Sequence, residues 1–247
     1  MSLQGQTAII TGGTKNLGAE TSKLLAGEGI NLFLQYRSNK EQAERFKAEL
    51  SKEFPHIQVE IYQTALDKAD ENTKLFEVAK SKFPKGLDFA INNIGKVVKK
   101  PIVEVTEKEF DEMHIANNKS AFFFIKEAAK NLNDNGAIVS LVTSLLAAYV
   151  GNYAIYQGLK APVQYYSKAA SQELKSRGIS VNTVAPGPMN TEFLINSEPK
   201  EAVEFYKTQA IGNRLTEVSD IAPIIKFLLK DGKWITGHTM FASGGFT

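Results

Sequence analysis

Short apolar runs alternate with longer amphipathic patterns along the whole 247-residue chain. The apolar runs predict strands at 7–11, 31–36, 59–63, 87–92, 137–142, 179–185 and 239–242. The patterns between them predict helices at 17–28, 39–53, 71–82, 106–131, 153–177, 199–209 and 217–230. This alternation indicates an α/β fold with a doubly wound parallel sheet and helices on both faces. We find no linker, repeat or low-complexity segment, so we expect a single domain over 1–247.

Polar and glycine-rich segments follow the predicted strands. They are TGGTKNLG, QYRSN, NNIG, VTS and APGPMNT, and each falls at the carboxyl end of its strand. Open parallel sheets bind ligands beyond these ends, at the point where the strand order reverses. We therefore expect the five segments to converge on one crevice.

The first of these segments lies in a strand, glycine-rich turn, helix context, which favours dinucleotide binding over a purely structural turn. Gly12 allows a sharp turn, and Gly18 allows the following helix to pack close to the sheet. The helix N-terminus then offers free N–H groups and a positive dipole end to a pyrophosphate.

The end of the second predicted strand indicates which dinucleotide binds. NAD-preferring folds usually place an acidic residue here for the ribose 2′-hydroxyl, but this chain has Gln35, Tyr36, Arg37 and Ser38. Arg37 can hold a 2′-phosphate through charge-assisted hydrogen bonds, and Lys15 is a second nearby cation. We expect NADP(H) rather than NAD(H); the alternative is that both cations are solvated surface charges.

Tyr156 and Lys160 stand four residues apart in a helical pattern, so they share one face and lie one turn apart. A free phenol ionises near pKa ~10, and a nearby ammonium favours the phenolate, which suits acid/base chemistry. Thr143 and Ser144 end the preceding strand and provide hydroxyls that can polarise a carbonyl. The alternative for the tyrosine and lysine is an ordinary surface pair.

Composition limits the other functions. The net charge of +2 gives no reason to expect nucleic acid or an anionic membrane as partner. The chain has no cysteine and three scattered histidines, so we expect no metal site. No apolar run reaches the ~18 residues of a membrane span, and the N-terminus lacks a leader pattern, so we expect a cytoplasmic protein.

Six motifs follow one another along the chain: TGGTKNLG, NNIG, Asn117, Thr143-Ser144, Tyr156-x-x-x-Lys160 and APGPMNT. In this order and spacing they resemble the short-chain dehydrogenase/reductase family, over essentially the whole chain down to ITGHTMFASGG. The resemblance implies a Rossmann fold with Tyr156 as general acid/base. It further implies that Lys160 lowers the tyrosine pKa and binds the nicotinamide ribose. A hydroxyl of the Thr143-Ser144 pair orients the carbonyl, and Asn117 holds a water in a proton relay.

Two of these positions remain open. Counting without gaps from Gly136 forward and from Tyr156 backward places Thr143 at the family serine, and Ser144 stays the alternative. Asn117 aligns with the family asparagine, and Asn118 is the other reading.

The chain also departs from the family pattern. Asn16 replaces a loop glycine, but asparagine tolerates a left-handed backbone. Ile94 is bulkier than the usual alanine, and Ala65 replaces an aspartate that contacts adenine, with Asp67 two residues later. Pro162 is expected to bend the helix after Lys160.

The resemblance extends to a full set of cofactor-binding positions. These are Gly12, Thr14, Lys15, Asn16, Leu17, Gly18, Tyr36, Arg37, Ser38, Ala65, Leu66, Asn92, Gly95, Tyr156, Lys160, Pro186, Gly187, Met189 and Thr191.

The expected reaction is hydride transfer between NADP(H) and a small-molecule carbonyl, with Tyr156 as acid/base. We expect an apolar pocket lined by Leu145, Leu146, Tyr149 and Tyr153 on one side and by a lid at about 188–214 on the other. The alternative for that segment is an ordinary pair of surface helices. Such a pocket suits a ketone, a β-keto ester or a 3-oxoacyl group. The alternatives are an NAD(P)-dependent alcohol or sugar dehydrogenase acting oxidatively, and a catalytically silent dinucleotide-binding or redox-sensing subunit.

The family usually forms dimers or tetramers, so the resemblance implies a homo-oligomer. Trp234, Ile235 and Phe246 are candidates for a buried interface near the C-terminal end.

Overall fold

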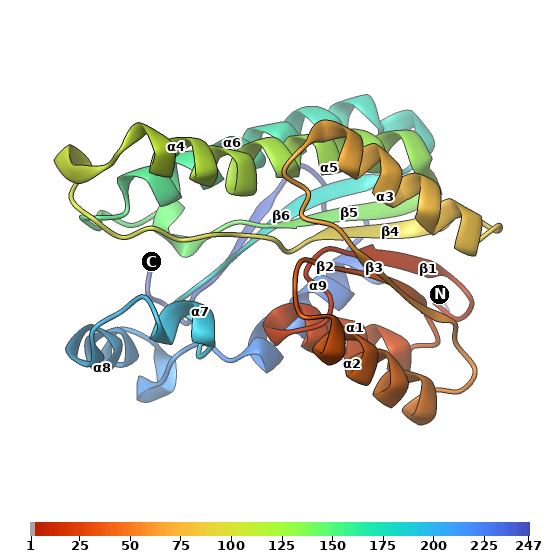
Figure 1. Ribbon diagram of the computed structural model, residues 1–247, viewed down its shortest axis with the longest axis horizontal. Helices are drawn as coiled ribbons and strands as arrows, with labels where there is room; N and C mark the ends of the chain where they lie inside the picture. The colour runs from red at the N-terminus through yellow and green to blue at the C-terminus, as the bar shows by residue number, and fades with distance from the viewer. Residues whose placement is uncertain (1–2) are drawn as a thin grey trace.

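The computed structural model describes residues 3–247, and a single parallel sheet forms its centre (Figure 1). Its seven strands lie in the order β3-β2-β1-β4-β5-β6-β7. They are β1 (Thr7–Ile10), β2 (Asn31–Tyr36), β3 (Val59–Gln63), β4 (Leu87–Asn92), β5 (Leu132–Leu141), β6 (Ser180–Pro186) and β7 (Thr239–Ala242). The predicted doubly wound parallel sheet is thus confirmed. The strand order reverses between β1 and β4, which places the ligand crevice at that junction.

Helices cover both faces of the sheet (Figure 1). One face carries α1 (Asn16–Gly27), α2 (Lys40–Glu53) and α9 (Val218–Leu229). The other carries α3 (Ala69–Lys82), α4 (Glu107–His114), α5 (Ser120–Asn131) and α6 (Ala154–Glu173). Within residues 3–247, no helix combines the length and the apolar character that a bilayer crossing requires.

Neighbouring strand residues divide between two cores because successive side chains point to opposite faces of a sheet. Ile10 and Leu34 pack in the core that also holds Leu25 of α1. Ile9 and Phe33, one residue earlier in the same strands, pack in the core on the opposite face. Strands buried on both faces explain why their sequences read as continuous apolar runs.

The predicted helix at 106–131 contains an irregularity that its apolar pattern did not indicate. α4 continues into a five-residue π-helical turn, Ile115–Lys119, before α5 begins. Asn117 lies in this turn and is fully buried. π-turns inside helices are often found at functional sites.

Two further boundaries differ from the sequence prediction. β5 begins at Leu132 rather than at 137, because Leu132 pairs with Leu87 before a shift in register leads to the regular pairing from Ala137. α6 ends at Glu173 rather than at 177, because a 3₁₀ turn at Lys175–Arg177 follows it. The helix runs through Pro162, and Tyr156 and Lys160 lie before the proline.

The segment at 188–214 folds into α7 (Glu192–Ile195), α8 (Lys200–Thr208) and a 3₁₀ turn at Ile211–Asn213. α7 and α8 stand apart from the other helices, on the side of the molecule where the chain ends (Figure 1). We call this segment the lid.

Candidate active site

The glycine-rich turn after β1 is closed by backbone contacts that exclude larger side chains. Gly12 has a φ of +59°, and a Cβ atom at Gly18 would lie 2.0 Å from the Gly12 carbonyl oxygen. α1 therefore begins directly against the turn, as the sequence predicts. Asn16 has a φ of 47°, which confirms that asparagine adopts the left-handed conformation in this loop.

A buried amide at the end of β2 supports this turn, and sequence reasoning did not identify it. The Gly12 N–H donates to Gln35 Oε1 at 2.8 Å, and the Gly13 N–H donates to the Gln35 carbonyl at 3.1 Å. Gln35 Nε2 in turn donates to the Thr64 carbonyl at 2.5 Å. Gln35 thus links the turn to the end of β3. The signal in the sequence was a long polar side chain, Gln35, within an otherwise apolar strand, which indicates a buried polar contact.

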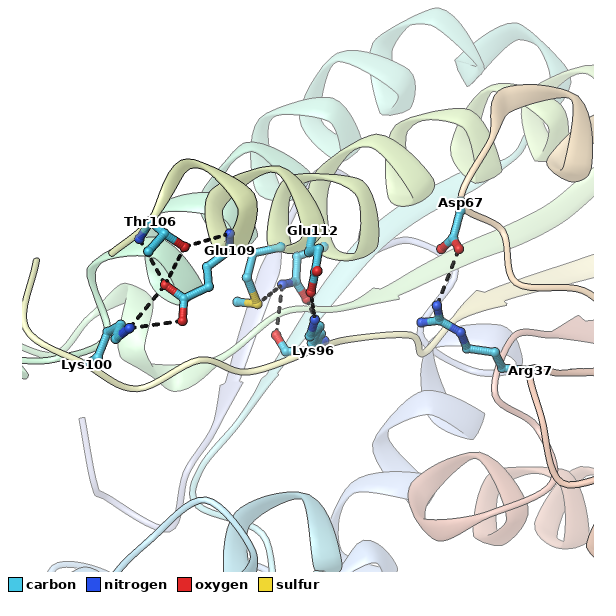
Figure 2. A network of polar contacts seen from close by, with 9 residues as sticks. Arg37, Asp67, Lys96, Lys100, Thr106, Glu109 and Glu112 are labelled. Atoms are coloured by element: carbon cyan, nitrogen blue, oxygen red, sulfur yellow. Dashed lines mark hydrogen bonds and ion pairs between the residues drawn. The ribbon is translucent and has the colours of Figure 1, made fainter. Parts of the chain in front are cut away.

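Arg37 lies directly after β2 with its guanidinium 3.3 Å from Asp67 Oδ2, in the loop after β3 (Figure 2). Both side chains are largely exposed, so the pair contributes little to stability and the guanidinium can exchange partners. Lys15 and Ser38 are also exposed. The basic groups expected for a 2′-phosphate therefore lie at the surface around the glycine-rich turn.

The remaining predicted cofactor residues line the carboxyl edge of the sheet. Leu66 is buried with a φ of 60°, and Ala65 precedes it after β3. Asn92 at the end of β4 accepts a hydrogen bond from the Thr11 hydroxyl at 3.2 Å. Other predicted residues are also buried; they are Thr14, Leu17, Tyr36, Pro186, Gly187 and Thr191. Met189 is half-buried and lines the cavity described below.

Lys160 reaches back from α6 to the ends of two strands. Its Nζ donates to the carbonyls of Ile94, at 2.9 Å, and Leu141, at 3.1 Å. Burial lowers the pKa of the ammonium from 10.5 to about 8. The two carbonyls hold the amine in place beside the active-site loop at 93–101.

Tyr156 is buried one turn before Lys160, and its pKa is raised from 10.0 to about 12. Burial is the main cause, because it disfavours the phenolate, while a hydrogen bond with the Thr143 side chain acts in the opposite direction. The lowering of the phenol pKa that we expected from Lys160 is not seen in this structure, in which burial dominates. Lys160 bonds to two carbonyls, and the lowering influence comes from Thr143.

The two asparagines of the π-turn have different surroundings. Asn117 Oδ1 accepts from the Lys96 N–H at 3.0 Å, and its Nδ2 donates to the Lys96 carbonyl at 2.8 Å. Asn118 instead accepts from the Tyr166 hydroxyl at 2.8 Å. Asn117 therefore holds the loop beside Lys160, whereas Asn118 contacts a different part of α6.

Thr143 and Ser144 are both buried after β5, and both line a cavity of about 90 Å³ that also meets Tyr156. The lid closes this cavity with Phe193, Leu194, Ser197 and Tyr206. The other walls are mostly apolar: Val97, Val142, Leu145, Val150, Pro186, Pro188, Met189 and Phe246.

Of the pocket residues predicted near Tyr156, Leu145 and Tyr153 do line the cavity. Tyr149 is fully exposed, and Leu146 packs against the core on the face of the sheet that α3, α5 and α6 cover.

A buried carboxylate adjoins the cavity and had no sequence signal. Glu198 lies between α7 and α8, and its side chain is completely buried. Its oxygens accept from the Tyr153 hydroxyl, from the Tyr206 hydroxyl at 3.2 Å and from Lys99 Nζ at 2.5 Å. These partners come from α6, from α8 and from the loop after β4, so only the folded chain brings them together.

Taken together, a glycine-rich turn at the sheet's switch point and a buried tyrosine–lysine pair define a nicotinamide-dinucleotide-dependent oxidoreductase. The family model described as enoyl-(acyl carrier protein) reductase matches residues 12–247. The NADPH-dependent aldehyde reductase-like protein, chloroplastic, of Arabidopsis thaliana is 30% identical, over 99% of this chain and 95% of the relative. The chain belongs to the short-chain dehydrogenase/reductase family.

Solved structures agree with this membership. A putative dehydrogenase from Burkholderia cenocepacia with bound NADP is 44% identical, with a TM-score of 0.96 over 100% of this chain and 95% of that chain. The short-chain dehydrogenase/reductase from Serratia marcescens BCRC 10948 is 27% identical, with a TM-score of 0.93 over 100% of this chain and 99% of that chain.

Proposed function

We propose that this protein is an NADP(H)-dependent carbonyl reductase acting on a ketone, a β-keto ester or a 3-oxoacyl group. The observation that carries this proposal is the buried Tyr156 phenol beside Thr143, facing a mostly apolar cavity. With a pKa of about 12, the phenol is protonated at neutral pH and is ready to donate. One domain, 1–247, then provides both the cofactor site and the substrate site.

The residues around the glycine-rich turn fit a dinucleotide. A side chain at Gly18 would clash with the turn, so the helix N-terminus stays open to a pyrophosphate. The exposed Arg37 guanidinium suits a 2′-phosphate, with Lys15 nearby. The NADP found in the Burkholderia structure supports the same choice of cofactor. When bound, NADPH supplies the hydride that a carbonyl carbon accepts.

The chain's own residues supply the proton and the orientation. Tyr156 donates its proton to the carbonyl oxygen, and the Thr143 hydroxyl holds that oxygen by a hydrogen bond. Lys160 and Asn117, which both adjoin Gly95, return a proton to the phenol through water. Lys160 also holds the nicotinamide ribose.

Two alternatives are less well supported. A sugar dehydrogenase needs several polar groups around its substrate, whereas this cavity is mostly apolar. A silent dinucleotide-binding subunit has no need of a buried tyrosine and lysine at a substrate cavity.

A panel of ketones, β-keto esters, 3-oxoacyl thioesters and aldehydes with NADPH and with NADH tests this function. We expect reduction with a preference for NADPH, and we expect Tyr156→Phe to lose nearly all turnover while NADPH affinity stays within about 3-fold. Turnover only of alcohols or sugars with NAD⁺ would contradict the proposal. So would unchanged turnover in Tyr156→Phe.

We further propose a cytoplasmic homo-oligomer, either a dimer or a tetramer. Phe110 of α4, Phe122 of α5 and Tyr165 of α6 are exposed, and all three helices cover the same face of the sheet (Figure 1). Trp234 is also fully exposed, whereas Phe246 lines the cavity and Ile235 packs against the core. Light scattering tests the assembly, and a monomeric mass would contradict it; cell fractionation tests the location.

A further inference from the structure

Three residues that line the cavity, Tyr153, Tyr206 and Ser197, carry hydroxyls whose protons are already donated within the protein. The phenols of Tyr153 and Tyr206 both donate to Glu198. The Ser197 hydroxyl donates to the carbonyls of Phe193, at 3.0 Å, and Leu194, at 2.9 Å. Each of these hydroxyls has one proton and two lone pairs, so each oxygen is left as an acceptor only.

Lys99 keeps this arrangement in place. Three lysines follow β4, and each pairs with a glutamate: Lys96 and Lys100 with Glu112 and Glu109 of α4 (Figure 2), and Lys99 with Glu198 of the lid. The Glu198 side chain is inaccessible to water, so its charge requires this counter-ion. A charged carboxylate has no proton to donate, and both phenols must therefore donate to it.

The rest of the wall offers few polar groups. Most of the other lining residues are apolar; the hydroxyls of Thr143 and Ser144 line the cavity with Tyr156, and Thr191 provides one further hydroxyl. A buried hydrogen-bond donor is costly without an acceptor, and the three acceptor-only oxygens of Tyr153, Tyr206 and Ser197 can provide one.

We propose that the cavity selects carbonyl compounds that carry a second group, a hydroxyl, able to donate a hydrogen bond to the lid-side oxygens of Tyr153, Tyr206 or Ser197. This inference rests on the proposed carbonyl reduction and specifies its substrate class. The preferred substrate is then an apolar hydroxy-carbonyl compound. An otherwise identical methyl ether offers the wall no proton.

The test compares matched pairs of ketones, one with a free hydroxyl and one with the same oxygen methylated, at several distances from the carbonyl. We expect the hydroxyl member of at least one pair to show a kcat/KM about 10-fold higher or more, mainly through KM. Tyr153→Phe and Tyr206→Phe each remove one acceptor, and at least one of them should reduce that ratio to near 1.

Glu198→Gln provides a sharper readout. The glutamine amide donates as well as accepts, so one phenol can turn its proton toward the cavity. The ratio of kcat/KM for the hydroxyl compound to that for its methyl ether should then fall toward 1 or below, because the protein now offers the ether oxygen a hydrogen-bond donor. Lys99→Gln should act in the same direction. Lys100→Gln, one residue along and paired with Glu109, is the matched control and should retain the wild-type ratio.

The outcomes separate this inference from the proposed function. If both members of every pair are reduced equally well, the donor preference is wrong while carbonyl reduction stands. If no ketone is reduced at all, the proposed function itself fails. An unchanged ratio in both phenylalanine variants would also overturn the inference, and these variants carry the test if Glu198→Gln does not fold.

Discussion

Lys160 and Asn117 approach the same point of the backbone, Gly95. A Cβ atom at this glycine would lie 3.2 Å from Lys160 Nζ and 3.4 Å from Asn117 Oδ1. Both side chains are almost completely buried, and both hold the loop after β4: the lysine through the Ile94 carbonyl and the asparagine through both backbone groups of Lys96. The absence of a side chain at Gly95 therefore lets both side chains lie close to this loop.

Gly95→Ala is expected to displace the Lys160 amine by a few tenths of an ångström. We expect kcat to fall about 10-fold while the protein remains folded, since small misplacements of catalytic groups are costly. Gly158→Ala is the matched control, because it lies in α6 between Tyr156 and Lys160 and a Cβ there meets no atom within 4 Å. Steady-state kinetics gives kcat for both variants. Equal kcat in Gly95→Ala and Gly158→Ala would contradict the role of Gly95.

The two hydroxyls after β5 are expected to differ in importance. Thr143 bonds to the Tyr156 phenol, so Thr143→Ala should lower kcat by about 100-fold or more. Thr143→Ser retains the hydroxyl and should recover most of the loss. Ser144→Ala should cost less than about 10-fold. A larger loss in Ser144→Ala than in Thr143→Ala would reverse the assignment.

Cofactor preference is expected to depend on Arg37 and on its present partner. Arg37→Ala should raise KM for NADPH by about 10-fold or more and leave KM for NADH nearly unchanged. Asp67→Asn releases the guanidinium from an exposed ion pair, so KM for NADPH should fall, but by less than about 5-fold. Steady-state kinetics with both cofactors provide the measurement. If Arg37→Ala affected both cofactors equally, the 2′-phosphate assignment would be wrong.

Lys160 is expected to reduce stability in a pH-dependent way. Its pKa falls from 10.5 in the unfolded chain to about 8 in the folded protein. Between these two pKa values the unfolded state binds more protons than the folded state, so the free energy of unfolding rises with pH. Below pH 8 the full cost of burying the charged lysine is present. Relative to Lys160→Met, the wild-type protein should therefore gain about 2 kcal/mol of unfolding free energy between pH 7 and pH 10.

Urea unfolding of both proteins at the two pH values measures this difference. The variant should have lost its activity, so stability and function oppose each other at this residue. An equal pH dependence in the two proteins would show that burial does not lower the lysine pKa.

The sheet, its helices and the glycine-rich turn could be predicted because each has a local pattern. Apolar runs defined the strands, and the four-residue spacing of Tyr156 and Lys160 placed them on one face. The spacing of the apolar residues gave no sign of the π-turn at Asn117, so it was not predicted. Glu198 and Gln35 also escaped prediction, because their partners are distant in sequence. The raised phenol pKa also escaped prediction, because the four-residue spacing indicates a nearby amine but not the depth of burial.

The cavity and the glycine-rich turn are built from different stretches of the chain. Apart from Val97, every residue that lines the cavity comes after residue 141, whereas the glycine-rich turn, Gln35 and Arg37 all lie within the first forty residues. Substrate range and coenzyme choice can therefore diverge independently during evolution. A chimera that exchanges only residues 192–214 between two relatives keeps the predicted cofactor residues Met189 and Thr191, and it should acquire a new substrate profile while its coenzyme requirement is unchanged.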